Sequence, residues 1–178
     1  MGYVKGRVLI SEEEIREKVK ELGAQISRDY KGKKVIFVCV LKGAAVFYTD
    51  LLREISEDVD VRFDFLAISS YGASTKSSGV VKIQKDLSTD IQDTNVIIVE
   101  DILDTGLTLA YIKNLLNDRS PKSLEICVLF DKKERRLTPV DAKYTGFVIP
   151  EEFIIGYGLD CAEQFRNLRS VYVAEQEE

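Results

Sequence analysis

Histidine is absent from the 178-residue sequence. Histidine is the side chain that titrates closest to neutral pH, so acid–base catalysis must use carboxylates, lysines or tyrosines. A zinc site built on histidine is excluded as well. Cysteine is scarce, because Cys39, Cys127 and Cys161 are the only three, widely spaced along the chain. We expect reduced cysteines that serve packing, as in a cytoplasmic protein.

Long apolar runs and long basic runs are missing too. No stretch approaches the length of a membrane span, and the amino end lacks a signal-peptide pattern. The net charge is −5, which disfavours non-specific binding of nucleic acid. With 45% hydrophobic and 31% charged residues, the chain has the composition of a globular protein. Its length predicts a single domain over residues 1–178.

Residues 95–108, N-V-I-I-V-E-D-I-L-D-T-G-L-T, are the most informative stretch. The β-branched run at 96–99 is typical of a strand buried on both faces of a parallel sheet. Two acids follow it, and then a helical stripe of apolar residues begins at Leu109. The segment between strand and helix therefore lies where open α/β sheets bind ligands.

The chemistry of this segment predicts an anion beside a group of acids. Residues 105–108 would direct free backbone N–H groups at a phosphate. Glu100, Asp101 and Asp104 would repel that phosphate, so they must face sugar hydroxyls, a metal or a proton to be moved. A phosphorylated sugar satisfies both requirements. The alternative is a plain capped helix with Asp104 or Thr105 as its N-cap, although buried acids without a task are costly.

The rest of the chain alternates between helical and strand patterns. Ser11 and Glu14 form a capping box before an amphipathic helix at 12–30. Apolar strands are expected near 35, 61, 96 and 123, with a further strand at 80–84 and a helix from about 46 to 55. We expect an α/β fold with a twisted, parallel sheet flanked by helices. Residues 11–143 would form its core. A strand-turn-strand unit apart from the sheet, at about 144–165, would form a small hood with the amino terminus over the carboxyl edge.

Three further segments have two interpretations each. Lys42 and Gly43 follow a strand and suit either a pyrophosphate site or a plain turn. The polar residues 69–79 suit either a lid over the reacting centre or a mobile hairpin tip. The charged residues 131–136 suit a solvated turn, unless one lysine, Lys132 or Lys133, turns inward.

The segment 95–108 resembles the phosphoribosyl-diphosphate signature of the type I phosphoribosyltransferases: an apolar strand, two acids, two residues and then D-T-G-x-T. With L-K-G at 41–43, S-Y-G at 70–72 and G-Y-G-L-D at 156–160, the chain is similar to the short bacterial hypoxanthine–guanine branch of that family. The resemblance implies transfer of ribose 5-phosphate from phosphoribosyl diphosphate to N9 of hypoxanthine or guanine. It also implies Mg²⁺ as cofactor and a homo-oligomer, dimer or tetramer, without a nucleic acid or membrane partner.

The resemblance also implies roles for individual residues. Asp104 would exchange a proton with purine N7. Lys132 would donate to the exocyclic oxygen of the base, Phe153 would stack on it, and Ile154 would read its edge. Metal would be held by Glu100, Asp101 and Asp160, of which Asp160 would also lie near the purine. The residues expected to bind phosphoribosyl diphosphate are Glu100, Asp101, Asp104, Thr105, Gly106, Leu107, Thr108, Leu41, Lys42, Gly43, Ser70, Tyr71 and Arg166.

Two other functions are weighed against this one. An RNA-binding attenuation regulator similar to a uracil phosphoribosyltransferase would need a basic face, which the acidic balance disfavours. A non-catalytic, flavodoxin-like binding module would leave Lys42, Ser70, Tyr71 and Asp160 as coincidences.

Overall fold

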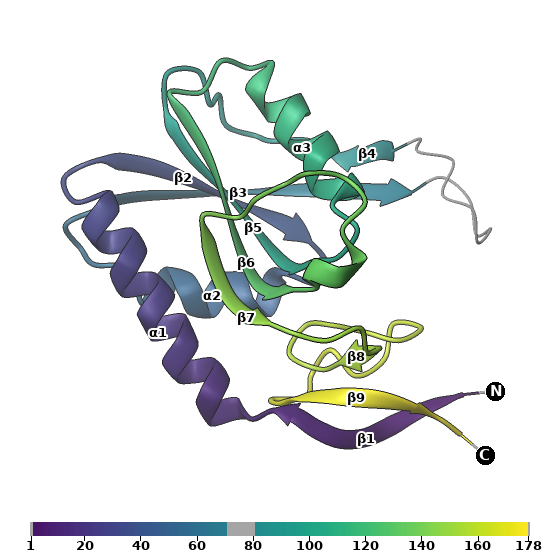
Figure 1. Cartoon of the computed structure of the whole chain (residues 1–178). Coiled ribbons are helices and arrows are strands. Elements are labelled where there is room, and N and C mark those ends of the chain that lie inside the picture. The colour runs from purple at the N-terminus through teal and green to yellow at the C-terminus, as the bar shows by residue number, and fades with distance from the viewer. Residues whose placement is uncertain (1, 71–80, 178) are drawn as a thin grey trace.

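The structure is a computed structural model that describes residues 2–70 and 81–177. Its main sheet has six strands in the order β4-β3-β2-β5-β6-β7 (Figure 1). Neighbouring strands are parallel, except that β4 runs antiparallel to β3 at one edge. The parallel character expected from the sequence is confirmed. The strands are β2 (Lys34–Leu41), β3 (Asp60–Ser70), β4 (Val81–Lys85), β5 (Asn95–Leu103), β6 (Ser123–Asp131) and β7 (Tyr144–Val148).

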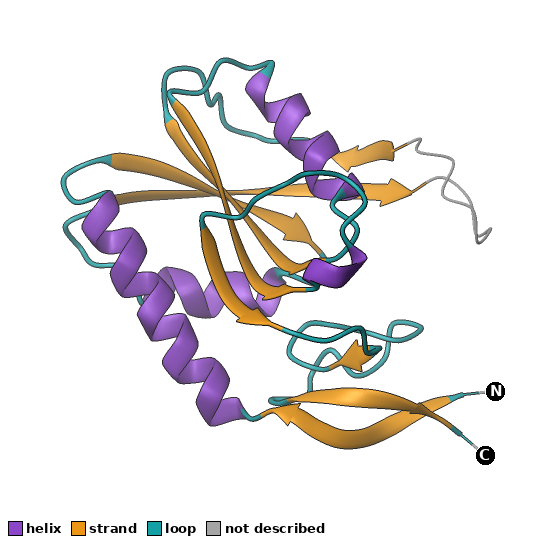
Figure 2. Cartoon of the chain, in the orientation of Figure 1, coloured by secondary structure: helices purple, strands orange, loops and turns teal. Residues whose placement is uncertain are grey.

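Helices cover both faces of this sheet (Figure 2). The helices α1 (Glu12–Asp29) and α2 (Ala45–Arg53) pack on one face, and α3 (Leu107–Asn117) packs on the other. The sequence of β2 is apolar without interruption because helices cover both faces of the sheet there, and a strand covered on both faces must bury every side chain. Alternate residues of β2 join the core under α1 and α2 (Val35, Phe37, Cys39) and the core under α3 (Ile36, Val38, Val40).

The helix ends follow the local sequence closely. At α1, the Ser11 hydroxyl accepts a hydrogen bond from the N–H of Glu14, and the Glu14 carboxylate accepts one from the N–H of Ser11, which confirms the capping box. Helix α2 ends at Arg53, so Ile55 lies outside the helix expected to carry it. No helix within residues 2–70 and 81–177 is long and apolar enough to cross a membrane.

A second, three-stranded antiparallel sheet lies beyond the carboxyl ends of β6 and β7 (Figure 1). Its strands are β1 (Tyr3–Ile10), β9 (Val171–Gln176) and β8 (Ile154–Ile155), in that order. The amino-terminal segment therefore contributes to the hood, as expected. The sequence interpretation missed β9, whose partner β1 lies at the other end of the chain.

The expected strand-turn-strand unit at about 144–165 is wrong in its first strand. Strand β7 pairs in parallel with β6 and forms an edge of the main sheet, whereas β8 pairs with β9 in the small sheet. The physical reason is burial, because Tyr144 is fully buried in the main core and Phe147 packs against that core. The hood thus begins after β7, near Pro150 rather than at residue 144.

Candidate active site

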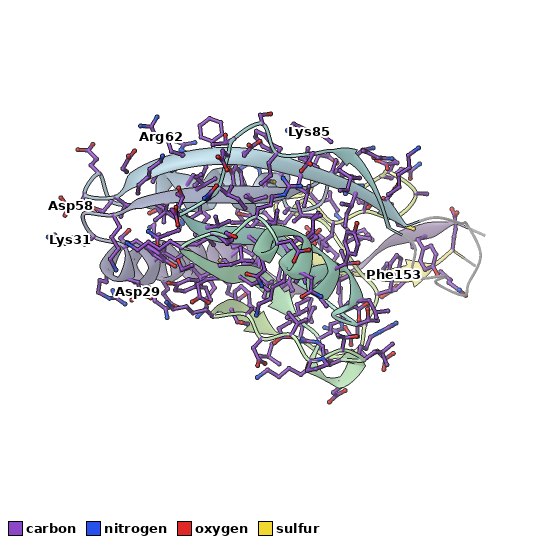
Figure 3. The ribbon with its side chains drawn as sticks, turned by 90° about the horizontal axis from the view of Figure 1, so that it is seen from above. Asp29, Lys31, Asp58, Arg62, Lys85 and Phe153 are labelled. Carbon is purple, nitrogen blue, oxygen red and sulfur yellow. The ribbon has the colours of Figure 1, made fainter. Side chains whose placement is uncertain are left out.

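The parallel register brings the predicted site segments to one edge of the main sheet. Leu41, the last residue of β2, pairs with Ala67 near the end of β3, and Leu103 pairs with Asp131 at the ends of β5 and β6. Residues 41–43, 100–108 and 131–132 therefore meet at the carboxyl edge, where α/β folds bind ligands. Figure 3 shows Phe153 at the end of the molecule opposite to Lys31 and Asp58, which precede the amino ends of β2 and β3.

Glu100 and Asp101 belong to strand β5 itself, which runs to Leu103, so their expected place after the strand is wrong. Each side chain is only 8% exposed. Burial raises the pKa of Glu100 well above its usual value, and the neighbouring Asp101 raises it further. Burial also raises the pKa of Asp101, while hydrogen bonds from Glu100 and the Ile102 N–H and the charge of Arg166 oppose that rise. Burial and the neighbouring acid thus both favour the protonated form of Glu100.

Two glycines allow the Lys42–Gly43 turn to approach this acid pair and the hood loop to approach that turn. A Cβ on Gly43 would lie 1.8 Å from Oδ2 of Asp101, so only glycine leaves room for the carboxylate. Gly158, at φ 96°, would place a Cβ 2.2 Å from the carbonyl oxygen of Gly43. The Lys42–Gly43 turn therefore lies between β5 and the hood, and the Leu41–Lys42 peptide bond is cis. The close approach of Gly158 was not anticipated, although it belongs to the G-Y-G motif.

The turn from Asp104 to Gly106 leads into α3. Gly106 is the N-cap at φ 85°, so neither Asp104 nor Thr105 caps the helix, and that alternative is wrong. Gly106 offers no side-chain cap, and the first turn of α3 carries no acidic residue. Within residues 2–70 and 81–177, the one side-chain contact to its N–H groups is long, from the N–H of Leu107 to the Thr105 hydroxyl at 3.5 Å. The first turn of α1, in contrast, holds three glutamates. The uncapped start of α3 offers backbone N–H groups and positive dipole charge to an anion.

Asp104 itself contacts the segment that follows β6. Nε of Arg135 lies 2.9 Å from Oδ1 of Asp104, and NH1 of Arg135 lies 3.3 Å from Oε1 of Glu151. Among residues 2–70 and 81–177, Oδ1 of Asp104 receives no hydrogen bond, so the Arg135 contact is an ion pair without hydrogen-bond geometry. Arg135, in the short 3₁₀ helix η1 (Lys133–Arg135), was missed, since local sequence does not reveal pairs across elements.

The structure distinguishes the two candidate lysines. Lys132 is buried at 6% exposure, and its Nζ donates a hydrogen bond to the carbonyl oxygen of Glu152 at 2.7 Å. Burial lowers the pKa of its ammonium group. Lys133 is exposed. Lys132 is thus the inward lysine, as expected from the resemblance.

The residues expected to hold the purine base lie in or next to the hood. Phe153 is 46% exposed, and its ring meets that of Tyr3 edge to face at 5.0 Å between centroids. Ile154 follows in β8, with its side chain buried. An exposed aromatic face at this edge is available for stacking, whereas a core phenylalanine would be covered.

The loop after β8 carries the remaining charged residues. NH2 of Arg166 lies 2.8 Å from Oδ1 of Asp160, and NH1 of Arg166 donates to the carbonyl oxygen of Gly158 at 2.8 Å. Nζ of Lys42 lies 3.2 Å from each carboxylate oxygen of Glu163, whose Oε2 is also 3.4 Å from NH2 of Arg166. Hydrogen bonding and charge from Lys42 lower the pKa of Glu163. Glu163 was also missed.

Some expectations lie beyond what the structure describes or are not met by it. Tyr71 lies outside the described residues, and Ser70 is the last residue of β3, with its side chain not described. Within residues 2–70 and 81–177, no three acidic or cysteine side chains form a group that could hold a metal alone. The expected set of Glu100, Asp101 and Asp160 is therefore not gathered into one cluster, and Asp160 pairs with Arg166 instead.

Comparisons with known proteins agree with this architecture. The model of the phosphoribosyl transferase domain family matches residues 11–162. The chain belongs to that family. A hypoxanthine-guanine phosphoribosyltransferase from Streptococcus agalactiae is 48% identical over 171 residues, covering 96% of this chain and 94% of the relative.

Solved structures of family members superimpose closely. A hypoxanthine-guanine phosphoribosyltransferase from Bacillus anthracis is 46% identical and matches with a TM-score of 0.91 over 98% of this chain and 100% of its own. A hypoxanthine phosphoribosyltransferase from Staphylococcus aureus, also 46% identical, matches with a TM-score of 0.92 over 96% of this chain and 92% of its own. This phosphoribosyl transferase fold therefore includes both sheets.

Proposed function

We infer that the chain transfers ribose 5-phosphate from phosphoribosyl diphosphate to N9 of hypoxanthine or guanine and releases diphosphate. The observation that carries this inference is the meeting of a helix start without a side-chain cap, a buried acid pair and one buried lysine at a single sheet edge. The relatives named above carry the same activity in their names. Neither alternative, the RNA-binding regulator or the non-catalytic module, receives support from them.

The 5-phosphate of the sugar would bind the start of α3. We propose that the N–H groups of Thr105, Gly106, Leu107 and Thr108 hold it, with the two threonine hydroxyls as further donors. Asp104, at the head of the same turn, would face the purine. Glu100 and Asp101 would hold the ribose hydroxyls and stabilise positive charge as it develops on the anomeric carbon.

The diphosphate would bind between β2 and the hood loop. Lys42, the Gly43 backbone and Arg166 are the proposed donors, joined by Ser70 and Tyr71. Arginine suits diphosphate because its planar fork makes paired, charge-assisted hydrogen bonds. Mg²⁺ fits the same edge without a three-carboxylate cluster, because it takes one or two carboxylates together with phosphate oxygens rather than an all-protein cage; either the Glu100–Asp101 pair or Asp160 would supply these carboxylates. When bound, the ion would neutralise charge on the leaving diphosphate.

The base would bind at the hood. Lys132 would donate to the 6-oxo group, Phe153 would stack on the purine plane, and Ile154 would offer main-chain groups to its edge, with Asp160 nearby. Lys132 would select 6-oxopurines over adenine, because an ammonium donor suits an oxo group and not the amino group of adenine.

The expected homo-oligomer stays a prediction, and so does the cytoplasmic location. All three cysteines are free thiols, and Cys39 and Cys127 are buried. Burial raises the pKa of the Cys39 thiol to about 12, so it is inert. Unpaired buried thiols are typical of a reducing compartment.

One assay tests the function. The purified chain is incubated with phosphoribosyl diphosphate, Mg²⁺ and, in separate reactions, hypoxanthine, guanine, xanthine, adenine or uracil, and nucleotide formation is followed. We expect turnover with hypoxanthine or guanine and none with adenine or uracil. The assignment would be overturned if uracil were the one base converted to a nucleotide, or if none of the five bases were converted. A parallel reaction in excess chelator should lose its activity, and undiminished activity there would remove Mg²⁺ from the proposal.

A further inference from the structure

Arg136 has a distinctive set of contacts directly behind Asp104. Its Nε donates to the carbonyl oxygen of Asp104 at 3.1 Å, and its NH1 donates to the carbonyl oxygen of Val140 at 2.5 Å. Its NH2 forms an ion pair with Asp131 at the end of β6. All three nitrogens of the guanidinium group are thus used, and the side chain is only 18% exposed.

The residues after Arg136 hold the same turn from the other side. The N–H groups of Leu137 and Thr138 both donate to the carbonyl oxygen of Thr105, at 2.9 and 3.1 Å. A Cβ on Gly106 would lie 2.7 Å from the carbonyl oxygen of Thr138 and 2.9 Å from Cδ of Arg136. Segment 136–138 therefore packs directly against the turn from Asp104 to Gly106.

We propose that Arg136 is a positioning residue for Asp104. The Asp104 carboxylate makes only a half-exposed, undirected ion pair with Arg135, so its direction must come from its backbone. Arg136 fixes that backbone by joining the end of β5 to the end of β6. The proposal rests on the proposed function, in which Asp104 exchanges a proton with the purine.

Arg136 acts without touching the substrate. It lines a pocket of about 480 Å³ between the end of β6, the 133–142 loop and β7. None of the residues proposed above to bind the sugar, the diphosphate or the base lines that pocket. In a variant that lacks the Arg136 side chain, this pocket gives a route for a small cation to the vacated position that does not pass the residues proposed to bind substrate.

Arg136→Lys is the first test, because it keeps the positive charge beside Asp131 but loses the planar fork that spans three acceptors. We expect kcat to fall by about 10²-fold, the loss that a small misplacement of a catalytic group can cause. The KM for phosphoribosyl diphosphate should stay within about threefold of wild type, since the Thr105 carbonyl keeps its backbone donors. Arg119→Lys is the matched control: Arg119 is 30% exposed and pairs with Asp86 at 2.8 Å, away from the site.

Two further measurements separate positioning from a merely structural role. In an Asp104→Asn background, Arg136→Lys should cost less than about threefold in kcat, because residues that act as a unit are not additive. Guanidinium ions at millimolar concentration should restore part of the kcat of Arg136→Ala and should not stimulate Arg119→Ala. Circular dichroism checks that each variant is folded at the assay temperature. If Arg136→Ala is unfolded, the kcat of Arg136→Lys and that of the Asp104→Asn, Arg136→Lys double variant decide whether Arg136 positions Asp104.

The outcomes are distinguishable. An inactive wild type would contradict the proposed function itself. An active wild type with an Arg136→Lys kcat within about twofold of it, or an equal loss in the Asp104→Asn background, would overturn the role of Arg136. A lower kcat that depends on Asp104 supports it.

Discussion

The ammonium group of Lys132 lies 2.7 Å from the carbonyl oxygen of Glu152 and is buried. That bond joins the end of β6 to the segment that leads into β8, where the base is proposed to bind. Lys132 is therefore held at the hood in the absence of substrate, and a 6-oxo group would take up a second of its three donor positions.

Replacing this lysine should weaken binding of the base selectively. A hydrogen bond to a charged group contributes about 1.5–3 kcal/mol, so Lys132→Ala should raise the KM for hypoxanthine by about 10- to 100-fold. The KM for phosphoribosyl diphosphate should change far less. Lys133→Ala, at the exposed neighbour, is the matched control in steady-state assays, and a larger effect there would show that the inward lysine has been misassigned.

Arg135 pairs with Asp104, the carboxylate that is proposed to face the purine. In that proposal the base displaces Arg135 from Asp104, so Arg135→Gln should lower the KM for the purine. The gain should be no more than about fivefold, because exposed ion pairs contribute about 0.2–1 kcal/mol. Steady-state titration with hypoxanthine measures it. A collapse of kcat in this variant would instead mean that Arg135 takes part in the chemistry.

Glu163 forms ion pairs with Lys42 and Arg166, the two cations that are proposed to bind diphosphate. Glu163→Gln removes this internal competitor, so the KM for phosphoribosyl diphosphate and the inhibition constant of diphosphate should both fall, by up to about fivefold. Glu57→Gln, an exposed glutamate between α2 and β3, serves as control. Unchanged constants in Glu163→Gln, measured by product inhibition, would show that the pairing has no bearing on diphosphate.

The buried acid pair should make ligand-free stability depend on pH. The folded chain holds the Glu100 proton more tightly than the unfolded chain, because burial raises the pKa of Glu100 above its usual value of 4.5. The stability from this proton is complete below that value and is lost as pH rises through the raised pKa. Glu100→Gln has no proton to lose, so the Tm of the variant minus that of wild type should grow from pH 4.5 upward.

Calorimetry across pH 4.5–8 measures this difference. A tenfold difference in proton affinity corresponds to about 1.4 kcal/mol, and each kcal/mol shifts the Tm of a chain of this size by about 2–4 °C. A difference that stays flat or shrinks with rising pH would contradict the raised pKa of the buried Glu100. The same variant should show a raised KM for phosphoribosyl diphosphate.

Local patterns predicted the elements whose causes are local. The capping box at Ser11 and the apolar run of β2 each follow from neighbouring residues, whereas Glu100 and Asp101 lie inside β5 and not after it as expected. Strand β9 was missed because its partner β1 lies at the other end of the chain. The placement of β7 was wrong because the burial of Tyr144 in the main core depends on tertiary packing that local sequence does not show. Many of the candidate site residues were predicted from the motif at 95–108 and from its resemblance to the signature of the type I phosphoribosyltransferases.

The ion pairs of the site could not be read from sequence. Arg135 with Asp104, Arg136 with Asp131 and Glu163 with Lys42 bring together residues from different elements, and surface charges are too common for spacing to select a pair. The choice between Lys132 and Lys133 likewise needed the path of the chain after β6, where only the first of the two turns inward.

Asp104→Asn tests the central claim most directly. Asparagine keeps the size of the side chain but cannot take a proton from N7 of the purine, and proton transfer by a placed side chain contributes about 10²–10⁴-fold. The measurement is the single-turnover rate of nucleotide formation from hypoxanthine and phosphoribosyl diphosphate, which excludes product release from the result. We predict a fall within that range with substrate binding retained. A single-turnover rate within about threefold of wild type would contradict the role of Asp104 as the acid–base group.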